Sequence, residues 1–211
     1  MNKLTNILEK NIKWLLLLFS FICFLTITED VFTHEIMIYD VVGYNIIYKY
    51  IINENLTPIM KCITWFGSVT ALIIITLLLF ILIKNKRISI FFSCNLIIVA
   101  ILNQFLKFIV QRPRPTEYRI INENGYSFPS GHSMISMAFY GYLMYLIYKH
   151  INSKILKWVL IITLGILIIL IGFSRIYLGV HYVSDILAGF VVSIGYLILF
   201  ISITNKFIYK K

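Results

Sequence analysis

Six long apolar segments limit what this chain can fold into. They cover residues 14–30, 60–83, 88–110, 131–149, 156–173 and 183–204, and a helix needs about 20 mostly apolar residues to cross a bilayer. Of the 211 residues, 60% are hydrophobic and 13% are charged, whereas soluble proteins have about 25% charged residues. The sequence therefore predicts an all-α integral membrane protein, a six-transmembrane-helix bundle in which residues 1–211 form one domain.

The basic residues predict how the bundle is oriented, because Lys and Arg accumulate in cytoplasmic loops. Six spans place both termini and two connections on one side, and this side holds most of the basic residues: Lys3, Lys10, Lys13, Lys84, Lys86, Arg87, Lys149, Lys154, Lys157, Lys206, Lys210 and Lys211. We expect cytoplasmic termini. Residues 31–59, 111–130 and 174–182 then lie on the extracytoplasmic side.

The formal charge of +10 is explained by this topology and does not indicate nucleic-acid binding, since the basic residues form no single face. The composition, rich in Ile, Asn and Lys, fits an inner or plasma membrane protein of a bacterium. A basic stretch precedes the first apolar run, as in a signal peptide, but no small-residue cleavage pattern follows. We therefore expect an uncleaved first span.

Three cysteines lie far apart within apolar runs, where they are typical of small hydrophobic residues and not of a disulfide or metal site: Cys23, Cys62 and Cys94. The sequence predicts no metal and no cofactor. The polar segment 31–59 is interpreted in two ways. Its apolar residues recur at roughly helical spacing, which favours an amphipathic helix at the membrane surface, but an ordered loop fits equally well.

Three polar clusters fall at the extracytoplasmic ends of the predicted spans. The first is Lys107 followed by Arg112-Pro113-Arg114-Pro115. Prolines cannot continue a helix, so we expect them to end the span and hold the arginines in extended backbone. Arginine and lysine suit phosphate oxygens, although basic residues at this depth also bind lipid headgroups without any catalytic role.

The second cluster is Ser130-Gly131-His132, directly before the fourth apolar run. Ser130 suits an N-cap, and Gly131 allows a ligand to come close to the backbone. Backbone amides at a helix N-terminus bind anions, and His132 could deliver a proton to a leaving oxygen. A histidine at a helix start is more often a cap or a surface residue, so His132 gains weight only from its neighbours.

The third cluster, residues 174–185, holds Arg175, His181 and Asp185 between two apolar runs. Charged groups at membrane depth are costly, which makes them candidates for function. His181 and Asp185 are four residues apart, and on a helix this spacing stacks them on one face. Asp185 could then orient His181 as a nucleophile. A structural polar seam between helices is the alternative.

In this order and spacing, the clusters resemble the three-part signature of the type 2 phosphatidic acid phosphatase (PAP2) superfamily. The matching positions are Lys107 and Arg114-Pro115, then Pro129-Ser130-Gly131-His132, then Ser174-Arg175, His181 and Asp185. The resemblance implies a phosphate site made by Lys107, Arg114, Ser130, Gly131 and Arg175. It also implies a phosphohistidine on His181, with Asp185 orienting it and His132 acting as acid and then base, and no metal.

The location and the resemblance together predict a membrane enzyme that hydrolyses a lipid phosphate. We expect undecaprenyl diphosphate as the substrate, since Arg112 and Arg119 add positive charge to the outer loop. Phosphatidylglycerophosphate and phosphatidic acid are the alternatives. A lipid phosphotransferase of the same family is a further enzyme alternative, and a small lipid transporter is the alternative without chemistry. The expected partners are the lipid substrate and the surrounding membrane lipids. The oligomeric state stays open.

Overall fold

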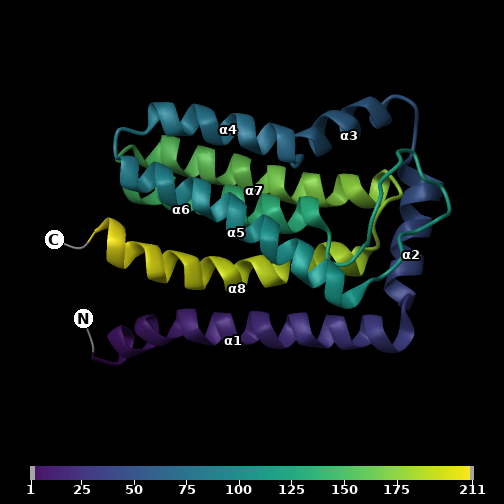
Figure 1. Ribbon diagram of the computed structural model, residues 1–211, viewed down its shortest axis with the longest axis horizontal. Helices are drawn as coiled ribbons and strands as arrows, with labels where there is room; N and C mark the ends of the chain where they lie inside the picture. Colours follow the sequence, from purple (N-terminus) through teal and green to yellow (C-terminus); the bar gives the residue numbers. More distant parts are fainter. Residues whose placement is uncertain (1–2, 210–211) are drawn as a thin grey trace.

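The computed structural model describes the backbone of residues 3–209 and the side chains of residues 11–209. Lys210 and Lys211, two of the predicted cytoplasmic residues, lie outside the described part. Every regular element within residues 3–209 is helical: α1 (Lys3–His34), α2 (Ile38–Ile46), the π-helical turn Ile47–Ile51, α3 (Leu56–Trp65), α4 (Val69–Leu82), α5 (Lys86–Val110), α6 (Gly131–His150), α7 (Lys154–Tyr177) and α8 (Val183–Ile208). The predicted all-α fold is confirmed (Figure 1).

The long helices run side by side, and the start of α1 and the end of α8 lie at the same end of the bundle (Figure 1). Four helices are long and apolar enough to cross a membrane: α1, α5, α7 and α8. Helices α3 and α4, which together cover the predicted segment 60–83, form a fifth candidate but are bent by 51° at their junction. Among the described residues the structure thus supports four or five spans by this criterion, while six remains a prediction.

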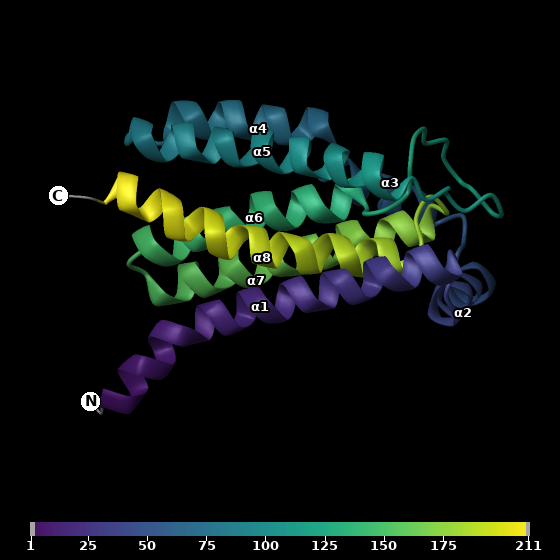
Figure 2. The ribbon, with the colours of Figure 1, turned by 60° about the horizontal axis from the view of Figure 1, so that its bottom comes forward.

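Helix α6 lies at the centre of the packing, and its environment explains its composition. It contacts α5, α7 and α8 (Figure 2). The side chains of Met134, Ala138, Phe139 and Tyr142 are fully buried there, and the ring of Phe139 meets Phe92 of α5 edge-on at 4.7 Å. Burying such rings on both sides of one helix contributes several kcal/mol. A helix enclosed by other helices also tolerates the polar residues that begin α6.

The break between α3 and α4 has a local cause. Ser68 caps α4 through its side-chain oxygen, which accepts a hydrogen bond from the Ala71 amide at 3.2 Å. Gly67 permits the close packing at the bend, because a Cβ there would lie 2.6 Å from Ile171 of α7 and 3.0 Å from the ring of His132. The predicted span is therefore interrupted at a point that faces the start of α6.

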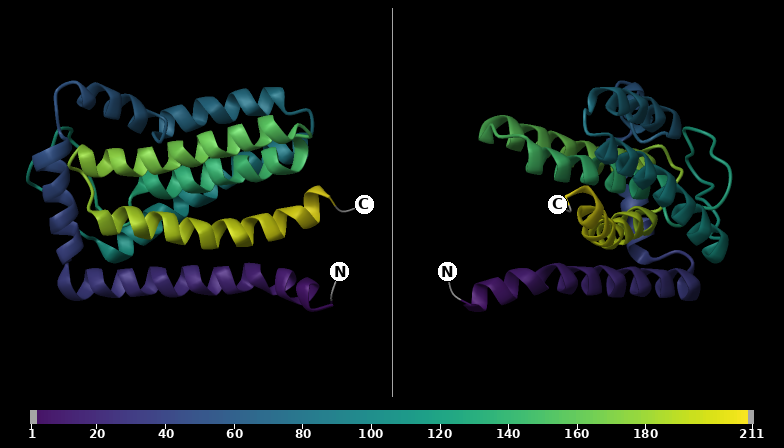
Figure 3. Two further views of the ribbon diagram at one scale, coloured as in Figure 1. Left: turned by 180° about the vertical axis from the view of Figure 1, so that it is seen from behind. Right: turned by 60° about the vertical axis from the view of Figure 1, so that its left-hand side comes forward.

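Helix α2 crosses the end of the bundle at a steep angle to the other helices, and Figures 2 and 3 show it from two further sides. This segment belongs to residues 31–59, and its helical interpretation is correct for residues 38–51. Its apolar residues face outward, with Ile38 83% exposed, whereas Asp40 is fully buried against the bundle. A helix with this arrangement fits the membrane interface, where apolar side chains meet lipid.

The turn between α7 and α8 depends on Gly179. Its φ of +72° lies in the left-handed region, and a Cβ at this position would lie 2.5 Å from the carbonyl oxygen of Tyr118. Glycine adopts this conformation without steric cost. The turn therefore brings loop 111–130 against the residues that begin α8.

We expect Gly179→Ala to destabilise the protein by at least about 1 kcal/mol, because alanine at positive φ is strained and its methyl group would meet the Tyr118 carbonyl. Gly165→Ala is the matched control, since a Cβ there has no neighbour within 4 Å in the middle of α7. Thermal unfolding of both variants in detergent tests this, and equal midpoints would contradict it.

Candidate active site

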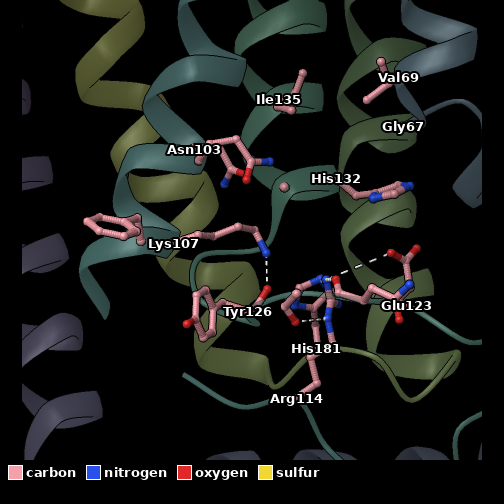
Figure 4. A pocket seen from close by; sticks show the side chains of 15 residues that line it. Gly67, Val69, Asn103, Lys107, Arg114, Glu123, Tyr126, His132, Ile135 and His181 are labelled. Atoms are coloured by element: carbon pink, nitrogen blue, oxygen red, sulfur yellow. Dashed lines mark hydrogen bonds and ion pairs between the residues drawn. The ribbon is translucent and has the colours of Figure 1, made fainter. Parts of the chain in front are cut away.

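The predicted site residues gather at the end of the bundle where α2 and loop 111–130 lie, around a cavity of about 520 Å³ (Figure 4). The cavity is lined by the start of α6, the end of α5, the α3–α4 break and two loops. Five of the eight predicted residues line it: Lys107, Arg114, Gly131, His132 and His181. The other three, Ser130, Arg175 and Asp185, are buried directly behind its wall.

Lys107 projects from the last turn of α5 with 8% of its surface exposed. The helix ends at Val110, its C-cap Gln111 adopts a left-handed conformation (φ 52°), and residues 111–116 form no regular secondary structure. The extended backbone expected for the arginines stays a prediction. The Lys107 ammonium donates a hydrogen bond to the Tyr126 carbonyl across loop 111–130 (Figure 4). The charge is thereby held at the edge of the cavity.

Arg114 is held by the backbone of two loops. Its guanidinium donates to the carbonyls of Gly125 at 3.0 Å, Asn124 at 3.1 Å and Val180 at 3.0 Å. Nη1 also lies 3.0 Å from Nε2 of His181. Backbone carbonyls fix the plane of the guanidinium, so its positive charge points at the imidazole and at the cavity beside it.

Arg175 lies in the last turn of α7 and is 1% exposed. It donates from Nη1 to the Thr64 hydroxyl at 2.8 Å and from Nη2 to the Glu123 carboxylate at 2.5 Å. Its Nε has no hydrogen-bond partner among the described residues. A buried donor without an acceptor costs about 1–3 kcal/mol, so this group is suited to an acceptor that is absent from the protein itself.

The start of α6 matches the prediction in part. Ser130 is the N-cap, and its Oγ accepts from the Ser133 amide at 3.4 Å. Its side chain is fully buried, while Gly131 exposes backbone at the cavity wall. His132 lines the cavity and makes no side-chain hydrogen bond to the described residues. Its ring is therefore available to a ligand.

His181 and Asp185 are in contact, but not for the reason predicted from their spacing. Helix α8 begins at Val183, after its N-cap Tyr182, so His181 precedes the helix and the two side chains do not share a helical face. Instead, Asp185 folds back in a capping box: its Oδ2 accepts from the Tyr182 amide at 2.9 Å, from Nδ1 of His181 at 3.2 Å and from the Ser127 hydroxyl.

These contacts define the tautomer of His181. Nδ1 carries the hydrogen that Asp185 accepts, and Nε2 keeps its lone pair toward Arg114 and the cavity. Burial lowers the pKa of His181 to about 4, although Asp185 favours the charged ring. The imidazole is therefore neutral near pH 7, and the lone pair of Nε2 accepts a hydrogen bond from Arg114 at the wall of the cavity.

A family comparison adds to this geometry: the model of the PAP2 superfamily matches residues 88–209. The chain belongs to the PAP2 superfamily. Phosphatidylglycerophosphatase B of Bacillus subtilis is 44% identical over 103 residues, which are 48% of this chain and 49% of that protein. The undecaprenyl-diphosphatase of Sulfolobus acidocaldarius is 29% identical over 175 residues, 77% of this chain and 78% of that protein.

A solved PAP2 structure extends the likeness to the whole fold. The crystal structure of a transmembrane PAP2-type phosphatidylglycerolphosphate phosphatase from Bacillus subtilis superposes with a TM-score of 0.78 at 27% identity. The superposition covers 92% of this chain and 98% of that chain. The sequence match to the first relative, in contrast, spans only about half the length of that protein. Together these matches identify an integral membrane protein of the PAP2 family.

Two polar residues of this PAP2 chain were not predicted from its sequence. Glu123 lines the cavity and joins the arginines: Oε1 lies 2.5 Å from Arg175, and Oε2 lies 4.0 Å from Arg114. Burial raises the pKa of Glu123, but the two arginines outweigh this and hold its pKa below the ordinary value. The second residue, Ser127, donates to Asp185. In the sequence, the one feature that could have indicated a role for Glu123 is that it is an acidic residue in a loop that contains arginines.

Arg112, which was expected to add positive charge to the outer loop, does not reach the cavity. Arg112 is 2% exposed and bonds to Asp40 and Asp185 on the side of Asp185 away from the cavity. Neither Arg112 nor Arg119 lines the cavity. No group of three or more His, Cys, Asp and Glu residues suited to a metal ion occurs in the part of the chain that the structure describes.

The position of Glu123 generates a prediction about anion binding. Its carboxylate satisfies Arg175, so an incoming phosphate must displace it. Glu123→Gln should therefore lower the Kd of inorganic phosphate by about tenfold, since a neutral amide competes less well for a guanidinium than a carboxylate does. Titration calorimetry of the protein in detergent measures this Kd.

Glu117→Gln is the matched control, because Glu117 is an exposed acidic residue of the same loop and lies outside the cavity. We expect its Kd for phosphate to stay within twofold of the unmodified protein. Weaker phosphate binding in Glu123→Gln would show that Glu123 orients the arginines and does not compete with the anion.

Proposed function

We propose that this protein is a membrane lipid phosphatase that forms a phosphohistidine on His181. The observation that carries the proposal is the orientation of that ring. Nε2 keeps its lone pair toward a cavity that presents Lys107 and Arg114, while Asp185 accepts the hydrogen of Nδ1 from behind. A neutral imidazole aimed at a cationic cavity is suited to attack an anionic, electrophilic group such as a phosphoryl group.

Phosphate binding is assigned to the cations and the start of α6. Arg114, Arg175 and Lys107 would neutralise the phosphoryl oxygens, with the unpartnered Nε of Arg175 as one donor. Ser130 would act through its N-cap position and Gly131 through its exposed backbone. Preorganised donors stabilise the charge that spreads over the equatorial oxygens during phosphoryl transfer, which is most of what this reaction requires from a protein.

The chemistry then needs two proton transfers. As Nε2 of His181 forms a bond to phosphorus, the bond from phosphorus to the leaving oxygen breaks, and His132 gives that oxygen a proton. Asp185 stabilises the positive charge of the phosphorylated ring through Nδ1. His132, now neutral, takes a proton from water as the water oxygen bonds to phosphorus and the bond from phosphorus to Nε2 of His181 breaks. Inorganic phosphate and neutral His181 result.

The proposed substrate is a lipid because the cavity continues among apolar residues of three membrane helices. Val69 of α4 and Ile135 of α6 line the part away from the loops (Figure 4), and Phe108 of α5 also lines the cavity. A phosphate at the polar end would therefore have its acyl chains among these residues. We also propose that the chain forms a single domain with six spans, cytoplasmic termini and an extracytoplasmic site in a cell membrane, on the basis of its charge distribution.

Within this class we place phosphatidylglycerophosphate first and undecaprenyl diphosphate second. The burial of Arg112 removes part of the positive charge that favoured a diphosphate. The names of the Bacillus subtilis relative and of the solved Bacillus subtilis structure both refer to phosphatidylglycerophosphate. Undecaprenyl diphosphate remains a candidate because the Sulfolobus relative aligns over a larger share of both chains.

Replacement of the proposed nucleophile tests the reaction directly. We expect His181→Ala to lower phosphate release from a lipid phosphate by at least about a thousandfold, because no other group could form the intermediate. The assay uses detergent-purified protein and a chelator, and release by the unmodified protein should continue in the chelator. Thermal unfolding of the variant checks that it folds. Undiminished release in a folded His181→Ala variant would refute the mechanism.

A substrate panel separates the lipid candidates. Phosphatidylglycerophosphate, undecaprenyl diphosphate, phosphatidic acid and a soluble monoester are compared by kcat/KM, and we expect the first to give the highest value. The soluble monoester should be poorest, since it cannot use the apolar part of the cavity. Product analysis with an added alcohol detects transfer in place of hydrolysis. Movement of lipid without any phosphate release would favour a transporter.

A further inference from the structure

A second polar cluster lies behind Asp185, on the side away from the cavity, and the proposed mechanism leaves it without a role. It consists of Asp40 of α2, Arg112 of loop 111–130 and Ser184 of α8. The exposed fraction of each is 2% or less. Together with Asp185, which Arg112 also contacts, the cluster buries two carboxylates and a guanidinium, and each buried ion carries a desolvation cost of several kcal/mol. Such a cluster is retained only where its geometry is of use.

Arg112 uses all five of its N–H groups within this cluster. Nη1 donates to Asp185 Oδ1 at 2.7 Å and to the Ser184 hydroxyl at 2.7 Å. Nη2 donates to Asp40 Oδ2 at 2.8 Å and to the Glu35 carbonyl at 2.5 Å, and Nε donates to the same carbonyl at 2.9 Å. No donor remains for a lipid headgroup or a substrate phosphate.

Asp40 reaches from α2 to the first turn of α8. Its Oδ1 accepts from the Ser184 amide at 2.8 Å, and its Oδ2 accepts from the Ser184 hydroxyl at 2.7 Å. Asp40 thereby accepts hydrogen bonds at the N-terminus of α8 although it belongs to another helix. An N-cap side chain has the same role within its own helix. Gly43 permits the approach, because a Cβ there would lie 2.6 Å from Val183. The α8 turn fixed in this way carries Asp185.

The charges of the cluster allow Asp185 to stay negative beside His181. Oδ2 of Asp185 faces His181, and Oδ1 faces Arg112. An arginine that paired with Asp185 alone would withdraw negative charge from the carboxylate that must stabilise a phosphorylated imidazole. Because Arg112 also pairs with Asp40, its charge is shared between two carboxylates. Asp185 is then held in place without being fully neutralised.

We propose that Asp40 and Arg112 are positioning residues, which fix Asp185 and through it the direction of Nε2 of His181. Helix α2 is then part of the support of the active site and not only a connection between spans. The proposal rests on the proposed function, since it assigns these residues to the phosphohistidine step. It predicts that damage to the cluster weakens bond formation at His181 more than it weakens anion binding in the cavity.

Two anions separate these effects. Inorganic phosphate in the cavity needs only the cations, whereas vanadate can also form a bond to Nε2 and imitate the transition state, for which orientation of the ring is required. Asp40→Asn keeps the shape of the side chain and removes its charge. We expect the Ki of vanadate to rise about tenfold in this variant, because a misplaced imidazole forms the bond to vanadium less well. The Ki of phosphate should stay within twofold, and kcat should fall with little change in KM.

Glu54→Gln is the matched control, because it also replaces a carboxylate by an amide, at an exposed residue of the same segment 31–59. Both inhibition constants should be unchanged in this variant. Ser184→Ala is a second variant that keeps all charges and the amide bonded to Asp40, and it should give a smaller shift in the same direction. It keeps the test decisive if Asp40→Asn does not fold.

Two results would overturn the proposal. The first is an unchanged vanadate Ki in folded variants, and the second is an equal loss of vanadate and phosphate binding, which would indicate general loosening. Failure of the proposed function looks different. In that case the unmodified protein itself would release no phosphate, or His181→Ala would retain activity.

Discussion

The buried carboxylate of Asp185 is the group on which the arrangement of the site depends. It is fully buried, and its two oxygens accept four hydrogen bonds, from Ser127, His181, Tyr182 and Arg112. An ion at this depth is stable only with such partners. Two partners come from loop 111–130 and two from the α7–α8 turn, so satisfying one charge joins these two segments to the start of α8.

This requirement explains why segments far apart in the sequence meet at one end of the bundle. Arg112 satisfies Asp185 and then needs a second carboxylate, which α2 supplies as Asp40. Ser130 donates its amide to the Asp185 carbonyl at 3.1 Å, which sets α6 against α8. The apolar packing around Phe139 and Tyr142 stabilises the helices along their length. The polar contacts determine how their ends are aligned.

The sequence was sufficient for features that depend on local chemistry. Length and hydropathy predict the long helices, and the identity and position of Ser130 predict the N-cap of α6. The three-part spacing predicts which cations and histidines meet. The prediction failed where pairing is decided by tertiary contact. Arg112 and Arg114 are two residues apart and chemically identical, yet one faces buried carboxylates and the other faces the cavity. Nothing local distinguishes them.

Asp40 and Glu123 could not be assigned from the sequence for the same reason. Asp40 lies on a short helix whose apolar residues face outward, so the usual inference that the apolar face is buried places its carboxylate on the wrong side. Glu123 is one acidic residue in a polar loop, and only the positions of Arg114 and Arg175 give it a role.

The carboxylates of Asp40 and Glu123 balance positive charge in two different ways. Asp40 balances a cation behind His181 permanently, because it is fully buried and bonded on both oxygens. Glu123 is about one-third exposed and can leave when an anion arrives. A site with three cations and one removable carboxylate would keep its arginines paired while empty and give up one weak acid for a phosphate. Under the proposed mechanism, permanent compensation behind His181 and exchangeable compensation in front of it would make the same site stable without substrate and strongly cationic when substrate binds.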